Sequence, residues 1–258
     1  GLAQTYAILG WWGYAPPNKS FTKAKAAAER ALSLDATLSE AQFALGIVRF
    51  LLDWDWLGAE QAFQRAIELS PGNADAHLFY GVLLKALTRN DRAVAEIRRA
   101  NELDPLNMMA SAETGWVAFH GGRINEAAQS CRRTLEMDPN YVFALWCLEM
   151  ALTLKKDPEA IIAAKKLVEL TSGDPYFLAQ LGWANGVLGH RVEAQRILTQ
   201  LGEISRTTPV PAPALMYVNL GLDNRDATFE YLEKSYRERW ADVIFIKSGP
   251  LYGAVRSA

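Results

Sequence analysis

Apolar side chains recur every third or fourth residue through most of the chain, and short polar, glycine-bearing or proline-bearing stretches separate the apolar segments. This spacing is typical of amphipathic helices and predicts an all-α protein. We expect about seven antiparallel helix pairs, at residues 2–9 and 21–34, 38–52 and 57–69, 74–87 and 91–103, 108–120 and 125–137, 142–154 and 158–170, 176–188 and 192–204, and 213–220 and 226–239.

A stride of 34 residues runs through the middle of the chain. It connects Pro71, Pro105 and Pro139, and it also carries Gly81 to Gly115. Proline ends one pair and starts the next because it lacks the N–H that a helix interior needs. A single pair of this size cannot bury its apolar face alone, so the pairs must stack. We therefore expect residues 1–258 to form one right-handed α-solenoid with a long concave surface.

Two regions depart from the repeat pattern. Residues 10–20, which include Pro16 and Pro17, are expected to form a loop insertion in the first pair. Residues 240–258 are expected to be irregular, with the apolar run 243–246 forming either an extended segment or part of a terminal cap. The chain begins without Met and inside an expected helix, so we expect it to be a fragment of a longer protein.

The small residues fall where a known repeat places them. Gly46, Gly81 and Gly115 lie in first helices, and the second helices carry small residues at matching positions: Ala59, Ala93, Ala127, Ala66 and Ala100. In these features the chain resembles the tetratricopeptide repeat family. The insertion, the 53–56 turn and the 229–236 segment are similar to the C-terminal repeat segments of bacterial multidomain regulators, whose host domains are winged-helix, cyclase or kinase domains.

The sequence departs from the family pattern at Ala36, where proline is expected, and at Glu149, where glycine is expected. In the family, the first helix of each pair lines the inner surface. The resemblance therefore implies a partner-binding groove formed by Phe43, Ile47, Phe50, Leu78, Val82, Lys85, Met109, Trp116, Phe119, Phe143, Trp146, Met150, Tyr176, Trp183 and Tyr217.

The expected groove is apolar and aromatic. Family members that grip a C-terminal carboxylate place Lys, Asn and Arg at these positions, and here only Lys85 has that chemistry. An apolar or amphipathic protein segment is the expected ligand, because large aromatic residues contribute most at interface centres. Self-association of the parent protein, an apolar small molecule, and burial of the groove by the chain itself are the alternatives.

Charge and hydropathy argue against two other partners. The formal charge is −2, with 27 basic and 29 acidic side chains mixed along the helices, so no basic stripe favours nucleic acid. No run of 18 or more apolar residues predicts membrane insertion, and the beginning of the chain lacks a signal-peptide pattern. We expect a cytoplasmic protein, although the non-cytoplasmic side of a membrane-anchored parent stays possible.

Catalysis, a cofactor and a metal site are not expected. His77, His120 and His190 fall in different repeats, without ligand spacing, and each is expected to be structural or solvated. Nucleophile, phosphate-binding and zinc-protease motifs are absent from the sequence. Cys131 and Cys147 are expected to be buried reduced thiols rather than a disulfide, because free cysteine behaves as a small hydrophobe.

Overall fold

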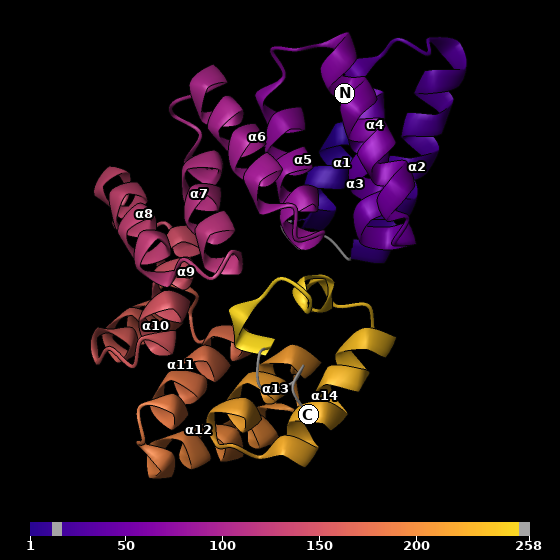
Figure 1. Cartoon of the computed structure of the whole chain (residues 1–258). Helices are drawn as coiled ribbons and strands as arrows, with labels where there is room; N and C mark the ends of the chain where they lie inside the picture. The colour runs from indigo at the N-terminus through magenta and orange to yellow at the C-terminus, as the bar shows by residue number, and fades with distance from the viewer. Residues whose placement is uncertain (12–16, 253–258) are drawn as a thin grey trace. The chain divides into compact units, whose positions relative to one another are not determined.

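The computed structural model describes residues 1–11 and 17–252, and within these ranges it contains helices and turns but no strands. The expected all-α fold of helix pairs is confirmed (Figure 1). The chain divides into two compact units, unit 1 at residues 1–110 and unit 2 at residues 111–258, and we describe each by itself. That all 258 residues form one solenoid stays a prediction.

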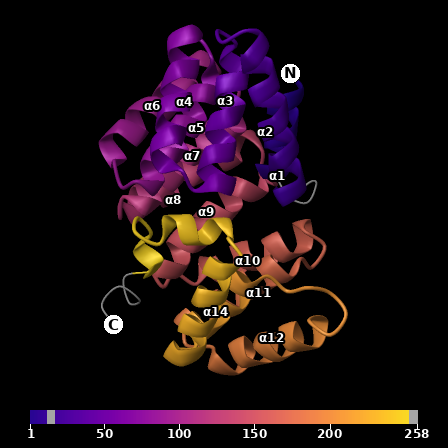
Figure 2. The same cartoon turned by 90° about the vertical axis from the view of Figure 1, so that its right-hand side faces the viewer.

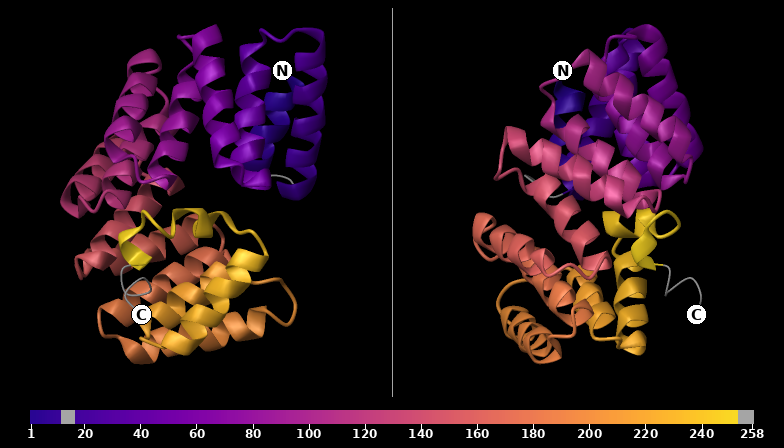
Figure 3. Two further views of the ribbon diagram at one scale, coloured as in Figure 1. Left: turned by 45° about the vertical axis from the view of Figure 1, so that its right-hand side comes forward. Right: turned by 60° about the vertical axis from the view of Figure 1, so that its left-hand side comes forward.

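Unit 1 consists of antiparallel helices that pack side by side (Figure 3). They are α1 (Leu2–Trp11), α2 (Pro17–Leu34), α3 (Ser39–Val48) with its π-helical extension η1 (Arg49–Asp53), α4 (Trp56–Leu69), α5 (Ala74–Ala86) and α6 (Asn90–Leu103). Helix α7 (Met108–His120) crosses the boundary between the units. Helix α2 begins at Pro17, where proline suits the first helical turn, so residues 10–11 and 17–20 of the expected insertion are helical instead. Residues 12–16 of that insertion lie outside the described part.

Unit 2 continues the alternation of first and second helices. Its members are α8 (Ile124–Met137), α9 (Val142–Leu154), α10 (Glu159–Leu170), α11 (Pro175–Val187), α12 (Arg191–Ile204), α13 (Ala212–Gly221) and α14 (Arg225–Arg237). Two short 3₁₀ turns, η2 (Ala241–Phe245) and η3 (Pro250–Tyr252), follow α14 in the segment expected to be irregular. This segment, yellow in Figure 2, turns back from the end of α14.

Side-chain caps and left-handed residues set the helix ends. The side chains of Asn73 and Asn224 accept hydrogen bonds from the backbone N–H groups of Ala76 and Ala227, which satisfies a donor at the start of α5 and of α14. At the other end of α5, Thr88 has a φ of 60°, a conformation in which a helix can terminate.

Glycine allows close helix approach where the repeat pattern predicts it. A Cβ at Gly81 would lie 2.6 Å from the Cδ1 of Ile97, on the second helix of the same pair. A tighter contact joins α11 to α13, where a Cβ at Gly186 would lie 2.5 Å from the carbonyl oxygen of Gly221. Since the opposing atoms at Gly186 are backbone, this contact tolerates no side chain.

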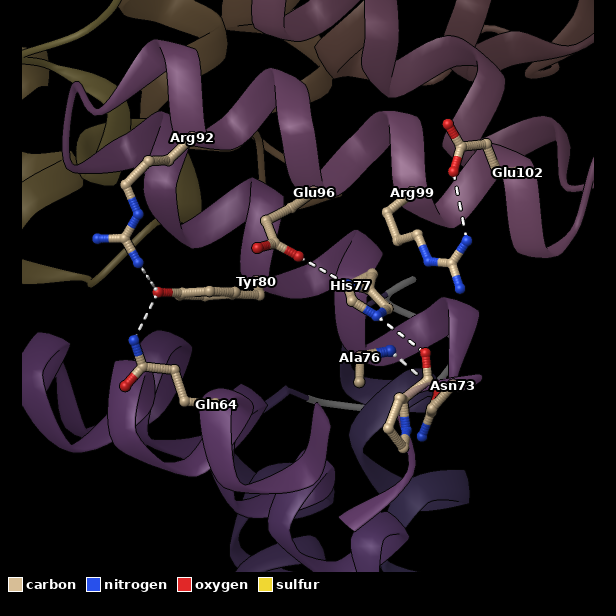
Figure 4. Close-up of polar contacts among 10 residues, drawn as sticks. Gln64, Asn73, Ala76, His77, Tyr80, Arg92, Glu96, Arg99 and Glu102 are labelled. Carbon is tan, nitrogen blue, oxygen red and sulfur yellow. Dashed lines mark hydrogen bonds and ion pairs between the residues drawn. The ribbon is translucent and has the colours of Figure 1, made fainter. Parts of the chain in front are cut away.

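Polar side chains tie α4, α5 and α6 together, as Figure 4 shows. The Tyr80 hydroxyl on α5 accepts hydrogen bonds from Gln64 on α4, at 2.8 Å, and from Arg92 on α6. On the same helix, His77 contacts Glu96 of α6, with 2.6 Å between ring nitrogen and carboxylate oxygen. These contacts support the structural role expected for His77.

The two cysteines differ from the sequence-based expectation. The structure joins Cys131 of α8 to Cys147 of α9 in a disulfide, with 6.4 Å between the Cα atoms. The expectation of two reduced thiols is wrong because the packing of α8 against α9 brings both sulfur atoms beside Gly115 of α7. A sequence separation of 16 residues hides this proximity from a reading of the sequence.

Candidate functional site

The predicted groove residues of unit 1 are packed inside the structure. Phe43, on α3, lies 5.4 Å from the Phe79 ring on α5 and 6.2 Å from the Phe63 ring on α4, centroid to centroid. The other members are also buried: Ile47, Phe50, Leu78, Val82, Lys85 and Met109. These positions fill the space between helices, so they offer a partner no exposed surface.

The predicted residues of unit 2 meet in one aromatic cluster. Trp116, Trp146, Tyr176 and Tyr217 come from α7, α9, α11 and α13, the first helices of successive pairs, and we call them the aromatic ladder. Successive ring centroids lie 4.8, 5.5 and 5.9 Å apart, within the range of favourable aromatic pairs. The sequence therefore brings together side chains from four repeats that are separated by up to a hundred residues.

Further predicted residues support this ladder. Phe143 contacts Trp116 at 5.5 Å, Phe119 contacts it at 5.7 Å, and Trp183 contacts Tyr217 at 6.0 Å. Met150 belongs to the same core cluster. Of the unit 2 residues predicted for the groove, only Phe143, Trp146 and Tyr176 are partly exposed; the remaining ones are buried.

The segment after α14 covers part of the ladder. The side chain of Asp242 accepts hydrogen bonds from the hydroxyls of Tyr176, at 2.5 Å, and Tyr217, at 3.1 Å. Phe245 packs against the His120 ring at a centroid distance of 4.8 Å. The ladder is thus an aromatic surface that also presents hydroxyl donors. The segment after α14 binds those hydroxyls and packs an aromatic ring beside the ladder.

Burial governs the electrostatics of this contact. Asp242 is partly exposed as a residue, but its carboxyl group is desolvated, and this burial raises its pKa; the two tyrosine hydroxyls act in the opposite direction. Desolvation disfavours the charged form, whereas hydroxyl donors favour it. Hydrogen bonds from the protein, rather than water, therefore stabilise the carboxyl group of Asp242.

A second buried carboxyl lies on α9, the helix that carries Trp146. Glu149 is fully buried, and burial raises its pKa to about 8. One carboxyl oxygen accepts a hydrogen bond of 2.8 Å from the Thr153 hydroxyl, and the other has no hydrogen-bond partner among the described residues. Glu149 occupies the position where the repeat pattern expects glycine, so this departure introduces a buried ionisable group.

Sequence reasoning missed the residues that cover the ladder. Asp242 and Phe245 lie beyond the last repeat, and His120 was expected to be structural or solvated. His120 has structural contacts with Phe245 and, through a ring nitrogen at 3.3 Å, with the Ser248 hydroxyl. The apolar run 243–246 was the available signal, because a short apolar segment outside the repeats needs a surface to pack against.

The remaining features to locate are His190, metal-binding groups and membrane-spanning helices. His190 lies at the start of α12, with a ring nitrogen 3.3 Å from the Asn185 side-chain oxygen. Within residues 1–11 and 17–252, no group of three His, Cys, Asp or Glu side chains is arranged to hold a metal. Over the same ranges, each helix is too short or too polar to cross a bilayer.

Comparisons with known proteins match this architecture. A family profile described as "Tetratricopeptide repeat" matches residues 55–100 and 83–142. The SPINDLY protein of Arabidopsis thaliana, a probable UDP-N-acetylglucosamine–peptide N-acetylglucosaminyltransferase, is 31% identical over 35% of this chain and 10% of its own length. The transcriptional regulator HilA of Salmonella typhimurium is 26% identical over 49% of this chain and 23% of its own length. The chain thus spans only a tenth to a quarter of these curated relatives.

Solved structures show the same fold at low sequence identity. A tetratricopeptide repeat protein from Parabacteroides merdae has a TM-score of 0.67 at 12% identity, covering 98% of this chain and 99% of its own. PilW, a type IV pilus biogenesis factor, has a TM-score of 0.66 at 21% identity, covering 80% of this chain and 95% of its own. The profile match identifies tetratricopeptide repeats within residues 55–142, and these structures show that the helix pairs of the described chain have the tetratricopeptide repeat fold.

Proposed function

We propose that this chain is a non-catalytic scaffold that binds an apolar or amphipathic segment of a partner protein on the aromatic ladder of unit 2. A tetratricopeptide repeat fold suggests a protein–protein interaction scaffold in general. The observation that supports binding at the ladder is that a segment of the chain itself, the one after α14, already contacts it. Asp242 of that segment accepts hydrogen bonds from the hydroxyls of Tyr176 and Tyr217, and Phe245 packs against the ring of His120 on α7.

The composition of the ladder supports a protein ligand. Large rings contribute most of the binding energy at interface centres, and hydroxyl donors at their edges add orientation. Trp146 and Tyr176 are partly exposed, and the indole N–H of Trp146 is buried without a hydrogen-bond partner in the described part of the chain. A backbone carbonyl of a bound segment could accept that hydrogen bond.

The host of this scaffold is part of the proposal. The similarity to HilA, which covers 49% of this chain, supports a docking or sensing arm of a bacterial regulator. The cytoplasm is the location expected for such a regulator. The Cys131–Cys147 disulfide weighs toward the non-cytoplasmic alternative, because disulfides persist mainly in oxidising compartments.

Photo-crosslinking in cells that express the native protein tests partner binding. A benzophenone amino acid at Phe143, which is partly exposed and packs against Trp116 of the ladder, should crosslink to an apolar segment of a different protein. The same group at Val192, 87% exposed on the second helix α12, is the matched control and should not capture that segment. Products confined to the chain itself, or capture of one partner equally at both positions, would contradict the proposal.

Self-association is a second candidate, favoured by exposed rings on α14 and just after it. Phe229, Tyr236 and Trp240 are 36%, 61% and 37% exposed, and they come from the last helix pair, which no further pair covers within the described residues. Light scattering over a wide concentration range tests it. A dimer that dissociates on Tyr236→Ser with Trp240→Ser supports this candidate, whereas a monomer at all concentrations opposes it.

A further inference from the structure

The segment that follows α14 is held mainly by its side chains. Residues 241–252 form only two short 3₁₀ turns, whose hydrogen bonds have poorer geometry than those of an α-helix. The backbone bonds in and just after the first turn are local: Val243 donates to Trp240 and Ile246 to Val243, each at 3.2 Å, and Ser248 and Gly249 donate to Phe245 at 3.1 and 2.8 Å. The stability of the segment therefore depends on what its side chains contact in unit 2.

Those side chains are spaced along three contact points. Asp242 binds the hydroxyls of α11 and α13, and Phe245, three residues later, packs on His120 of α7. Leu251 is buried, at 7% exposure, in the core cluster that includes Trp116. Along the segment, an acidic residue thus contacts the ladder, an aromatic residue contacts His120 beside it, and an aliphatic residue lies in the same core cluster.

The polar contacts make this arrangement selective. Asp242 accepts hydrogen bonds from two tyrosine hydroxyls of the ladder, so an apolar residue at this position would take this acceptor away from both hydroxyls. Ser248 adds a contact of 3.3 Å to His120. A purely apolar peptide would fit this surface less well than one that carries a carboxylate ahead of its aromatic residue.

A tethered segment competes strongly with a free one. A segment joined by a short linker acts at an effective concentration on the order of millimolar. A partner must bind more tightly, or be more concentrated, than a free segment would require in order to displace it. The connection from α14 to Asp242 is short, because α14 ends at Arg237. Occupancy in cis consequently weakens the apparent affinity for any segment that uses the same contacts.

We propose that residues 241–251 are a built-in occupant of the partner-binding face, and that the partner segment displacing them carries the same chemistry: a carboxylate, an aromatic residue three positions later, and a following aliphatic residue. This inference rests on the proposed function and adds to it the chemical class of the partner and a means of regulation. Covering the ladder with its own segment keeps the aromatic surface from binding apolar segments unselectively.

The test uses a fluorescent peptide with the sequence of residues 240–252 and the full chain. Anisotropy titration should show at least tenfold tighter binding to the Asp242→Ala, Phe245→Ala double variant than to the unaltered chain. The same peptide with alanine in place of its aspartate should bind the double variant at least tenfold more weakly. Equal affinity of both proteins for the peptide, or equal binding of a scrambled peptide, would overturn the inference.

Two further measurements keep the test decisive. Adding Tyr176→Phe and Tyr217→Phe to the double variant should reverse the gain, whereas Tyr236→Phe on the exposed part of α14 should not. If the double variant does not fold, hydrogen exchange on the unaltered chain replaces it: excess peptide should accelerate exchange at the amides of Val243, Ile246 and Gly249. Unchanged exchange at saturating peptide would overturn the inference.

The two proposals fail separately. If Phe143 captures a segment of another protein in cells but the 240–252 peptide does not bind, the scaffold function is supported and the proposal of a built-in occupant is rejected. If the peptide binds but no segment of another protein is captured in cells, the built-in occupant is supported and the proposed partner binding is rejected.

Discussion

Glu149 gives the chain a pH dependence of stability that its exposed carboxylates cannot produce. Its folded-state pKa is about 8, against 4.5 for an ordinary glutamate, because burial on α9 disfavours the ionised form. Below the ordinary value the carboxyl is protonated in both the folded and the unfolded chain, and it costs nothing. Between the two values the folded chain holds a proton that the unfolded chain has released, so the free energy of unfolding falls as the pH rises.

The magnitude follows from the size of the shift. One bound proton changes the free energy of unfolding by about 1.4 kcal/mol per pH unit, so the step from about pH 5.5 to about pH 7.5 costs roughly 3 kcal/mol. The loss levels off at roughly 5 kcal/mol once the pH exceeds the folded-state pKa. Burial also raises the pKa of Asp75 and of Asp242, so the slope of the whole chain contains their contributions in the same direction.

Glu149→Gln isolates the contribution of this residue, because it keeps the side-chain shape and removes the titration. Urea unfolding, followed by circular dichroism and by tryptophan fluorescence, should give the Gln variant a shallower decline of stability over this pH range, by about 1 kcal/mol per pH unit. Glu169→Gln, on an exposed position of α10, controls for the loss of a charge. Parallel pH profiles for the Glu149→Gln variant and the unaltered chain would refute the reasoning.

Three more predictions come from packing and covalent structure. Gly186→Ala should destabilise the chain by about 1–3 kcal/mol, because the added Cβ would meet the backbone of Gly221. Gly202→Ala, which has open space around it on α12, should stabilise the chain by about 0.5–1 kcal/mol. Thermal unfolding measures both effects, and equal melting temperatures for the two variants would contradict them. Gln180→Met should raise the free energy of unfolding by about 1–3 kcal/mol in urea, because both polar side-chain atoms of Gln180 are buried without partners among the described residues, and a loss of stability would count against this account. Alkylation before and after reduction, read by mass spectrometry of protein from its native cells, should label Cys131 and Cys147 only after reduction; labelling of the unreduced, unfolded protein would show free thiols instead.

The helices were predictable because their signal is local. Apolar spacing and the prolines at the ends of pairs determine where a helix begins and ends, and the expected bounds 108–120 and 142–154 agree with α7 and α9. Helix α2 was the exception: the sequence placed a loop up to residue 20, but Pro17 can occupy the first turn of a helix and does so.

The site was predictable only in part because it depends on contacts between repeats. The first-helix rule selected Trp116, Trp146, Tyr176 and Tyr217, and the structure brings these four together. The same rule also selected Phe43, which packs between helices, because an apolar residue on a first helix serves a core as well as a groove. Asp242 could not be found, since a single acidic residue beyond the repeats carries no sign of the two tyrosines that bind it.

Hydroxyl-radical footprinting of the ladder tests the central claim most directly, namely that the chain's own C-terminal segment occupies a partner-binding face in unit 2. The account predicts slow oxidation of Tyr176 and Tyr217 in the unaltered chain and faster oxidation in the Asp242→Ala, Phe245→Ala variant, with exposed Tyr236 oxidised equally in both. Oxidation of Tyr176 and Tyr217 at the same rate in both proteins would contradict it.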